Sequence, residues 1–461
     1  MPTYNTPGVY IEEVATLPPS AVATATAIPA FIGFTEKGAP DVVEVAVVSS
    51  LLEFVERFGK PKPTPFVVDI NDGITIVPAA KATPIAASPS VPERPLFYAM
   101  SLYFANGGGR CYVASIGNYS TVPSAEKYLA AFAALEREDE PTLIVMPDLG
   151  VLPQADFAAV SQQALAHCAK LDDRFAILDV RGPKGAKDVE DFRSGIGTTG
   201  LSYGAAYHPY LVTALVHQFD EKLVTVTVAG PAKDGKAGAP EQKSLADLAA
   251  LDTTRYNRIK QKLSTTRVIL PPSAAVAGVY MRVDSERGVW KAPANVSLSA
   301  VIGPLVPINP EQQALLNVEP VSGKSINAIR AFAGKGTLIW GARTLAGNDN
   351  EWRYIPVRRL FLNLEDTARK ATAFAVFEPN DADTWLKVKG MLDALLYNFW
   401  EQGALQGATP EDAYYVNIGL GKTMTRQDIL EGRMIIELGV AAVRPAEFIV
   451  VRFSHLLASS G

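Results

Sequence analysis

The sequence has few of the residues that build disulfides, metal sites or catalytic triads. It contains two cysteines, Cys111 and Cys168, and four histidines in 461 residues. Two cysteines cannot form a disulfide framework, and alone they cannot hold a metal ion. The histidines show no HxxxH or HExxH spacing, so we expect each to be a structural side chain and expect no metal or cofactor. They are His167, His208, His217 and His455.

The sequence also lacks a strong charge of either sign and a long apolar run. A net charge of -5 and an isoelectric point near 5.6 do not show the excess of positive charge that is typical of nucleic-acid-binding proteins. No stretch approaches the run of about 18 apolar residues that a membrane helix needs. The opening residues, MPTYNTPGVYIEE, lack the basic region and apolar core of a signal peptide. We therefore expect no nucleic-acid partner, no membrane insertion, and assembly in the cytoplasm of the producing cell.

The length and the order of the patterns indicate a multi-domain α/β protein. A chain of 461 residues exceeds one ordinary core, so two or three domains are expected. From residue 124 onward, helical and strand patterns alternate, which predicts an α/β domain with parallel strands. The expected helices cover 50–59, 95–106, 124–138 and 153–171, and the expected strands cover 110–116, 142–147, 174–180 and 207–215.

Two stretches of the chain have the composition of insertions. Residues 60–95 are rich in Pro, Ala and Thr and are predicted to be a loop insertion. Residues 216–266 combine a strand-like run at 222–228, a Gly- and Lys-rich segment, and helical spacing over 244–263. This second stretch is predicted to be a surface insertion.

The N-terminal residues predict a strand that has no neighbour in the sequence. Thr6-Pro7-Gly8 is a turn signal, residues 9–14 have strand character, and the prolines of Leu17-Pro18-Pro19-Ser20 end the run. An isolated strand cannot satisfy its own backbone hydrogen bonds and must pair with a sheet. It is a frayed tail, an edge strand of its own domain, or an arm that adds a strand to a neighbouring subunit.

Two glycine-rich segments resemble nucleotide-binding loops. Gly195 to Gly200 match GxGxxG, but no strand pattern precedes them and no helical pattern follows, so a flexible loop is expected. Gly419 to Thr423 end like a phosphate-binding loop, but the required first glycine is Val416, so a compact polar turn is expected. The Asp172-Asp173 and Asp381/Asp383 pairs lie where loops and helix starts favour aspartate. No catalytic constellation emerges, and we expect the protein not to be an enzyme.

The last ninety residues carry an amphipathic helix and two strongly apolar strand patterns. The helix is expected over 383–402, capped by Asn380 or Asp381. Its apolar stripe is formed by Val388, Leu392, Leu395 and Phe399, with Trp385, Leu396 and Trp400 beside it. The strand patterns cover 434–443 and 448–455, joined at Pro445, and their nearly continuous apolar residues predict strands covered on both faces. Chain ends normally fray, so such a strand must be held by a partner sheet.

Several collinear segments together resemble contractile tail sheath proteins. They include TPGVYIEE at 6–13, LPPSAAVAGVY at 270–280, RVD at 282–284, RGVWKAPAN at 287–295, NAIR at 327–330, WGARTL at 340–345, WRYIPVRRL at 352–360 and FEPN at 377–380. The resemblance covers both ends and most of the middle, and it is weakest over 60–95 and 216–266.

The resemblance implies a mixed α/β, multi-domain sheath fold. Residues 1–20 would be an inter-subunit arm, and residues 21–215 with 267–345 an α/β domain that carries the insertions 60–95 and 216–266. Residues 346–461 would be the C-terminal sheath domain and its arm. Sheath subunits stack as hexameric rings around an inner tube and contract to drive that tube through a target envelope, without nucleotide hydrolysis. Their arms interlock with strands of neighbouring subunits, and we expect hinges at 16–20 and around Pro445.

The resemblance also implies sites and partners. The arm residues would be Val9, Tyr10, Ile11, Glu12, Phe448, Val450, Val451 and Phe453, and Lys387 and Lys389 would face the tube. The partners would be further copies of the chain, the inner tube protein, baseplate and terminator or cap proteins, and other sheath paralogues. The particle would be a phage tail or a tail-like injection system, and the modest length favours the second. The alternatives are an α/β nucleotide-binding enzyme, suggested by residues 195–200, and a baseplate structural protein.

Overall fold

The computed structural model describes residues 24–76, 91–182, 185–233 and 236–448. The chain divides into two compact units, one formed by residues 25–363 with 444–448, and one formed by residues 364–443 with Thr24. The boundary falls inside helix α10 (Ile355–Thr372), later than the predicted start of the C-terminal domain at residue 346. Both units combine helices and strands, which confirms the predicted mixed α/β class.

The larger unit is built on a nine-stranded sheet. Its strand order is β13-β16-β15-β8-β7-β6-β1-β5-β2, and every pairing from β15 through β5 is parallel. The flanking strands β2, β16 and β13 pair antiparallel. The bounds are β1 Pro29–Gly33, β2 Glu44–Val48, β5 Cys111–Ser115, β6 Leu143–Val145, β7 Phe175–Asp179, β8 Gly204–His208, β13 Val296–Ser297, β15 Ile326–Phe332 and β16 Gly336–Trp340.

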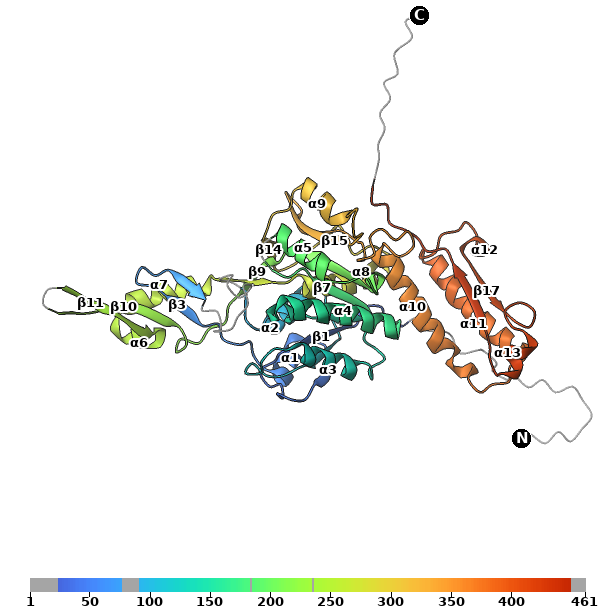
Figure 1. The fold of residues 1–461 in the computed structure, drawn as a ribbon, viewed down its shortest axis with the longest axis horizontal. Helices are drawn as coiled ribbons and strands as arrows, with labels where there is room; N and C mark the ends of the chain where they lie inside the picture. The colour runs from blue at the N-terminus through green and yellow to red at the C-terminus, as the bar shows by residue number, and fades with distance from the viewer. Residues whose placement is uncertain (1–23, 77–90, 183–184, 234–235, 449–461) are drawn as a thin grey trace, which may run out of the picture. The chain divides into compact units, whose positions relative to one another are not determined.

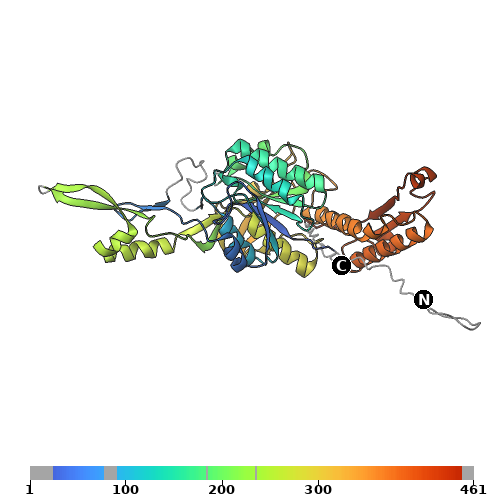
Figure 2. The same ribbon diagram turned by 90° about the horizontal axis from the view of Figure 1, so that it is seen from below.

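Helices cover both faces of this sheet (Figures 1 and 2). Alternate residues of each central strand enter opposite cores, so Phe31 packs with α1 (Leu51–Phe58), α2 (Leu96–Ala105) and α8 (Ser273–Arg287). Its neighbour Ile32 packs with α3 (Ala125–Leu135), α4 (Gln154–Leu171) and α5 (Ala186–Gly195) on the other face. Strands buried on both faces read as continuous apolar runs, which explains why the sequence pattern predicted this domain.

The first predicted helix shows how local residues define an element. Ser50 caps α1 by accepting a 3.2 Å hydrogen bond from the backbone N–H of Glu53, and the helix stops at Gly59. Gly59 has a φ of 94°, and a Cβ there would clash with the Glu36 side chain, so glycine suits this stop. The helices expected at 95–106, 124–138 and 153–171 are also confirmed as α2, α3 and α4.

The strand expected over 207–215 is wrong as a single element. Strand β8 ends at His208, and β9 (Leu211–Val216) belongs to a different, three-stranded antiparallel sheet. In that sheet β9 lies between β12 (Arg267–Leu270) and β14 (Val301–Pro304). Apolar residues lie on both sides of His208-Pro209, so the two strands were read as one.

The prediction that residues 60–95 are a loop is also wrong in part. They contain β3 (Phe66–Val68) and β4 (Ile74–Ile76), which join β10 (Thr225–Lys233) and β11 (Lys236–Ser244) in one four-stranded sheet. Helices α6 (Leu245–Leu251) and α7 (Thr253–Ser264) pack on this sheet around a separate apolar cluster (Figure 1). The described parts of the two insertions therefore form one small layer, because β3 pairs with β10, and paired residues such as Val67 and Thr225 are 158 positions apart in the sequence.

The smaller unit contains the second half of α10, η3 (Ala373–Ala375), α11 (Ala382–Glu401), α12 (Pro410–Ala413), β17 (Tyr414–Ile418), α13 (Arg426–Leu430) and β18 (Ile436–Val440). The predicted amphipathic helix is confirmed as α11. Asp381 caps it by accepting a 3.0 Å hydrogen bond from the N–H of Thr384. Val388, Leu392, Leu395 and Phe399 are buried as expected. Strands β17 and β18 pair antiparallel, with Val416 opposite Leu438.

Candidate inter-subunit surfaces

The glycine segments that resemble nucleotide-binding loops have ordinary structural roles. Gly195 is the last residue of α5, so the GxGxxG segment follows a helix instead of a strand. The next glycines have positive φ, and Gly200 lies against the backbone of Leu165 in α4. In the second segment the Thr423 hydroxyl donates a 2.6 Å hydrogen bond to the carbonyl of Ile435. The first segment is the end of α5 followed by a loop, and the second is a compact turn, as predicted for each.

The described histidines lie apart and are buried. The ring of His167 stacks on Phe132, and His217 shares a 2.9 Å hydrogen bond with the Thr64 hydroxyl. Burial lowers the pKa of His167 and of His208 to about 4, so both rings are neutral at physiological pH. Among the residues that the structure describes, no group of three or more His, Cys, Asp or Glu side chains is placed to hold a metal ion. His455 lies outside the described residues.

Two carboxyl groups at the ends of central strands were missed by the sequence analysis; Asp148 is buried and Asp179 is partly buried. Asp148 follows β6 and accepts a 2.8 Å hydrogen bond from the N–H of Phe34. Asp179 ends β7 and accepts hydrogen bonds from the N–H and the hydroxyl of Ser273, at 2.8 and 2.5 Å. Burial raises the pKa of both groups to about 7. Strand ends of parallel sheets often carry ligand sites, so these carboxylates are the most enzyme-like feature of the described chain.

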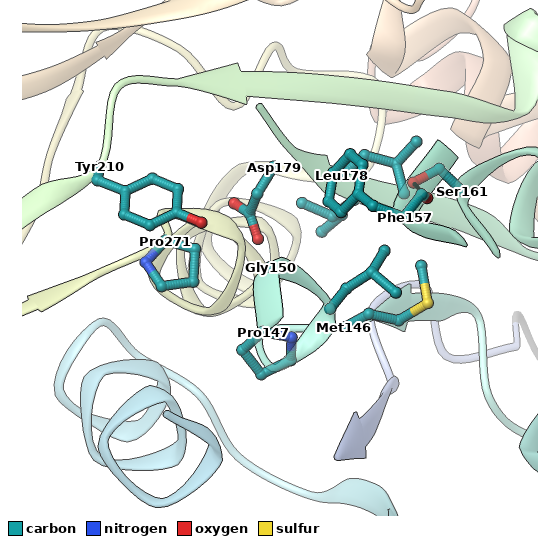
Figure 3. Close-up of a pocket in the computed structure, with 11 residues that line it drawn as sticks. Met146, Pro147, Gly150, Phe157, Ser161, Leu178, Asp179, Tyr210 and Pro271 are labelled. Atoms are coloured by element: carbon teal, nitrogen blue, oxygen red, sulfur yellow. Dashed lines mark hydrogen bonds between the residues drawn. The ribbon is translucent and has the colours of Figure 1, made fainter. Parts of the chain in front are cut away.

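The space beside Asp179 is too small for a substrate. A cavity of about 10 Å³ lies next to its carboxylate, near Tyr210, Gly150 and Pro271 (Figure 3). This volume holds about one water molecule. The hydrogen bonds given above instead attach β7 to the first residue of α8 and β6 to the end of β1. The two carboxylates therefore join strands to their neighbouring segments.

The sheet of the smaller unit has two open edges. Within the described residues it consists of β17 and β18 alone, so each strand has an unpaired edge. The strand pattern over 434–443 is confirmed, but its predicted burial on both faces is wrong in this single chain. Leu438 and Ile435 are each 39% exposed, and Tyr415 on β17 is 48% exposed. Strands with open edges and exposed apolar residues are typical templates for pairing with another chain.

The solvent-facing side of α11 carries charged and apolar groups together. Lys387 is exposed, and Lys389 is partly buried, with its Nζ 4.0 Å from an Asp393 carboxylate oxygen. Leu386 is 72% exposed, and Tyr397, three turns later on the same side, is 43% exposed. The sequence analysis named the two lysines and did not name Leu386 or Tyr397.

The arm residues are described only in part. Phe448 is exposed and does not belong to a strand in the single chain. The remaining predicted arm residues, Val9, Tyr10, Ile11, Glu12, Val450, Val451 and Phe453, and the hinge at 16–20, lie outside the described residues. None of the described helices is both long and apolar enough to span a bilayer.

Comparison with known proteins identifies relatives for the whole chain. Residues 347–455 match the family described as the phage tail sheath C-terminal domain. The tail sheath protein of Vibrio phage KVP40 is 27% identical over 144 residues, and this match spans 30% of the present chain but only 20% of the phage protein.

Two solved structures match almost the full length. The sheath of the extracellular contractile injection system PVC, in its contracted state, is 29% identical with a TM-score of 0.66, and the match covers 98% of each chain. The contracted helical sheath of the anti-feeding prophage AFP is 33% identical with a TM-score of 0.64, covering 98% of this chain and 99% of that one. This chain belongs to the contractile tail sheath family.

Proposed function

We propose that this protein is the structural subunit of the sheath of a contractile injection system. Copies of it would polymerise as hexameric rings stacked around an inner tube, and contraction of this array would drive the tube through a target envelope. The observation that carries the proposal is the full-length likeness to two contracted sheath assemblies, which covers 98% of this chain in each case. The partial match to a phage tail sheath protein, which is a more distant relative, supports the same function.

The open sheet of the smaller unit supports assembly by strand exchange. An isolated two-stranded sheet is marginally stable, and its unpaired edges expose backbone donors and acceptors. We infer that strands from residues 9–14 and 448–453 of neighbouring copies pair with β17 and β18. Twenty extended residues reach about 65 Å, which is enough to cross onto another subunit. Donation from head to tail makes a heterologous interface, which propagates as a helical array instead of closing as a dimer.

The contraction would be mechanical. The α/β unit has apolar cores on both faces of its central sheet, so it would move as a rigid body. Reorientation would be absorbed at residues 16–20 while the paired arms stay connected. We place no hinge around Pro445, because its neighbours Arg444 and Glu447 are hydrogen-bonded within the α/β unit. The energy would be stored when the extended array assembles, so no nucleotide would be hydrolysed and the protein would not be an enzyme.

The partners follow from the place of a sheath in such a machine. The exposed side of α11, with Lys387 and Lys389, would face the inner tube. The ends of the array would meet baseplate and terminator proteins, and sheath paralogues would extend it. The particle would assemble in the cytoplasm of the producing cell before it acts.

Electron microscopy tests the proposal directly. The chain, co-expressed with its tube protein, is expected to form hollow striated cylinders in negative stain. A deletion of residues 1–17 is expected to leave a folded monomer that does not polymerise, because the donated strand is lost. A variant in which residues 1–17 are scrambled at the same length is the matched control for arm length, and it should fail in the same way. Normal cylinders from the deletion variant would rule out strand donation by this arm.

A further inference from the structure

The chain returns to the α/β unit just before its C-terminal arm. Residues 364–443 form the smaller unit, and the last hydrogen bond within it joins the N–H of Val443 to the carbonyl of Ala404, at 3.2 Å. The next residue, Arg444, belongs to the α/β unit, where its Nη1 donates a 2.7 Å hydrogen bond to the carbonyl of Asn350. The arm therefore starts from a different unit from the one that precedes it in the sequence.

Glu447 makes the main contacts of this returning segment. Its carboxylate receives three hydrogen bonds from Arg343: from Nε to Oε1 and Oε2 at 2.9 and 3.1 Å, and from Nη2 to Oε2 at 2.6 Å. The Asn317 amide donates to Oε1 at 2.6 Å, and the Tyr354 hydroxyl donates to Oε2 at 3.2 Å. The Arg343 side chain is 4% exposed and that of Glu447 is 20% exposed. A forked, largely buried ion pair of this kind fixes both the position of the Glu447 side chain and its orientation.

Arg343 is held in place independently of Glu447. Its N–H donates a 2.9 Å hydrogen bond to Oδ1 of Asn327 on β15, and the Asn327 amide donates back to the Arg343 carbonyl at 2.8 Å. Its Nη1 donates to the carbonyls of Asn317 and Gly347, at 3.4 and 3.3 Å. The guanidinium is thus preorganised beside the end of the nine-stranded sheet, with one side left for a carboxylate.

The surroundings of Glu447 favour the ionised form of its carboxyl group. Burial alone would raise the pKa of its carboxyl, but the hydrogen bonds from Arg343, Asn317 and Tyr354 outweigh burial and hold that pKa below its ordinary value. The group is therefore ionised at neutral pH. A buried guanidinium without its carboxylate is strongly unfavourable, so the pair differs from the exposed ion pairs of the surface, which contribute little.

We propose that the Arg343–Glu447 pair anchors the base of the C-terminal arm in the α/β unit. The donated segment would then begin after Phe448, and the thirteen residues 449–461 would reach about 43 Å when extended. A tensile force on the arm would also be transmitted through this ion pair to the nine-stranded sheet, and not through residues 364–443. This inference rests on the proposed exchange of arms for its role in the assembled sheath, but the anchor itself is a property of a single chain.

Limited chymotrypsin digestion of the unassembled full-length protein tests the anchor. Cleavage after Phe448 requires Glu447 and the residues beside it to leave the surface and enter the protease, so the anchor protects this bond. Glu447→Gln keeps the shape of the side chain and removes its charge, and it is expected to speed cleavage after Phe448 by about tenfold. Cleavage after Phe453, beyond the anchor, is expected at the wild-type rate. Glu44→Gln, which breaks the exposed pair with Arg57, is the matched control and should leave both rates unchanged.

A second variant separates loss of the anchor from loss of the fold. Arg343→Met with Glu447→Gln removes the buried charge as well as its partner, so the α/β unit should stay folded while chymotrypsin cleavage after Phe448 remains fast. Circular dichroism confirms folding before digestion. If both variants are folded and are cut after Phe448 at the wild-type rate, the anchor does not exist.

Assembly of the same variants distinguishes the anchor from the proposed arm exchange. Deletion of residues 449–461 removes the donated segment, and cylinders made by that variant would refute exchange by this arm while leaving the digestion result valid. With exchange intact, the double variant is expected to form cylinders that break at lower shear than wild-type cylinders. Equal breakage would overturn the role of the anchor in carrying load.

Discussion

The buried ion pair between Arg359 and Asp284 gives the sharpest prediction about stability. Arg359 lies in α10, and its guanidinium donates to both carboxylate oxygens of Asp284 in α8, at 3.0 and 2.6 Å. The side chains are 3% and 4% exposed, and the guanidinium also lies 4.5 Å from the ring centroid of Tyr280. Burial alone would lower the pKa of Arg359, but the Asp284 carboxylate outweighs burial and raises it. The pair joins the first half of α10 to α8 within the α/β unit.

Asp284→Asn removes the countercharge and leaves the guanidinium buried. Breaking a buried pair from one side costs about 3–5 kcal/mol, because the remaining charge is uncompensated. The change should therefore lower the free energy of unfolding of the α/β unit by this amount. Asp284→Leu combined with Arg359→Met removes both charges and should recover most of the loss, since apolar replacement of a buried pair is often neutral.

Native-state hydrogen exchange measures this effect in the α/β unit alone. The amides of β6 and β7 lie in the sheet centre, and their slowest exchange reports the opening of this unit. Asp191→Asn is the control, because its pair with Lys187 is exposed and 3.8 Å long, and a change within about 0.5 kcal/mol is expected. A similarly small change for Asp284→Asn would show that water or rearrangement compensates the guanidinium, contrary to this reasoning.

Two further predictions concern charge at other places in the chain. Because Asp148 and Asp179 have pKa values raised from about 3.8 to about 7, the folded state binds more protons than the unfolded state between these values. The free energy of unfolding should therefore fall as the pH rises from about 4 to 7, by roughly 3–4 kcal/mol per group. Asp148→Asn should reduce this pH dependence when denaturation curves at pH 5 and pH 8 are compared. An unchanged pH dependence in the variant would contradict the raised pKa of Asp148. Replacing Lys387 and Lys389 together by Glu should weaken co-sedimentation with the tube protein at low salt more than at high salt, whereas equal loss at both would exclude a charged contact.

The parallel sheet could be predicted from sequence because its signals are local. Central strands such as β1 are buried on both faces and read as short apolar runs, and the helices between them have caps and apolar stripes. The N-cap of α11 was restricted in the same way to Asn380 or Asp381, and Asp381 is the residue that caps the helix. These features depend on residues within a few positions of one another, so a single sequence contains them.

The features that the sequence analysis missed depend on distant residues. Strand β3 reads as part of a proline-rich loop, because its partner β10 lies more than 150 residues further along the chain. The carboxylate of Glu447 meets Arg343 across 104 residues, and that of Asp179 meets Ser273 across 94. No periodicity marks such pairs, and a lone aspartate or glutamate in a sequence is most simply read as a solvated side chain.

The disagreement over β18 is itself informative about function. The residues over 434–443 have the pattern of a strand buried on both faces, yet in the single chain Leu438 is 39% exposed and one strand edge is unpaired. A strand with this composition and an open edge would promote uncontrolled aggregation if nothing covered it. A solved relative is a helical sheath, and under the function proposed above further copies of this chain would supply the missing cover. On that proposal, the sequence encodes the burial of the assembled sheath, and the single chain shows the surface on which that assembly would be built.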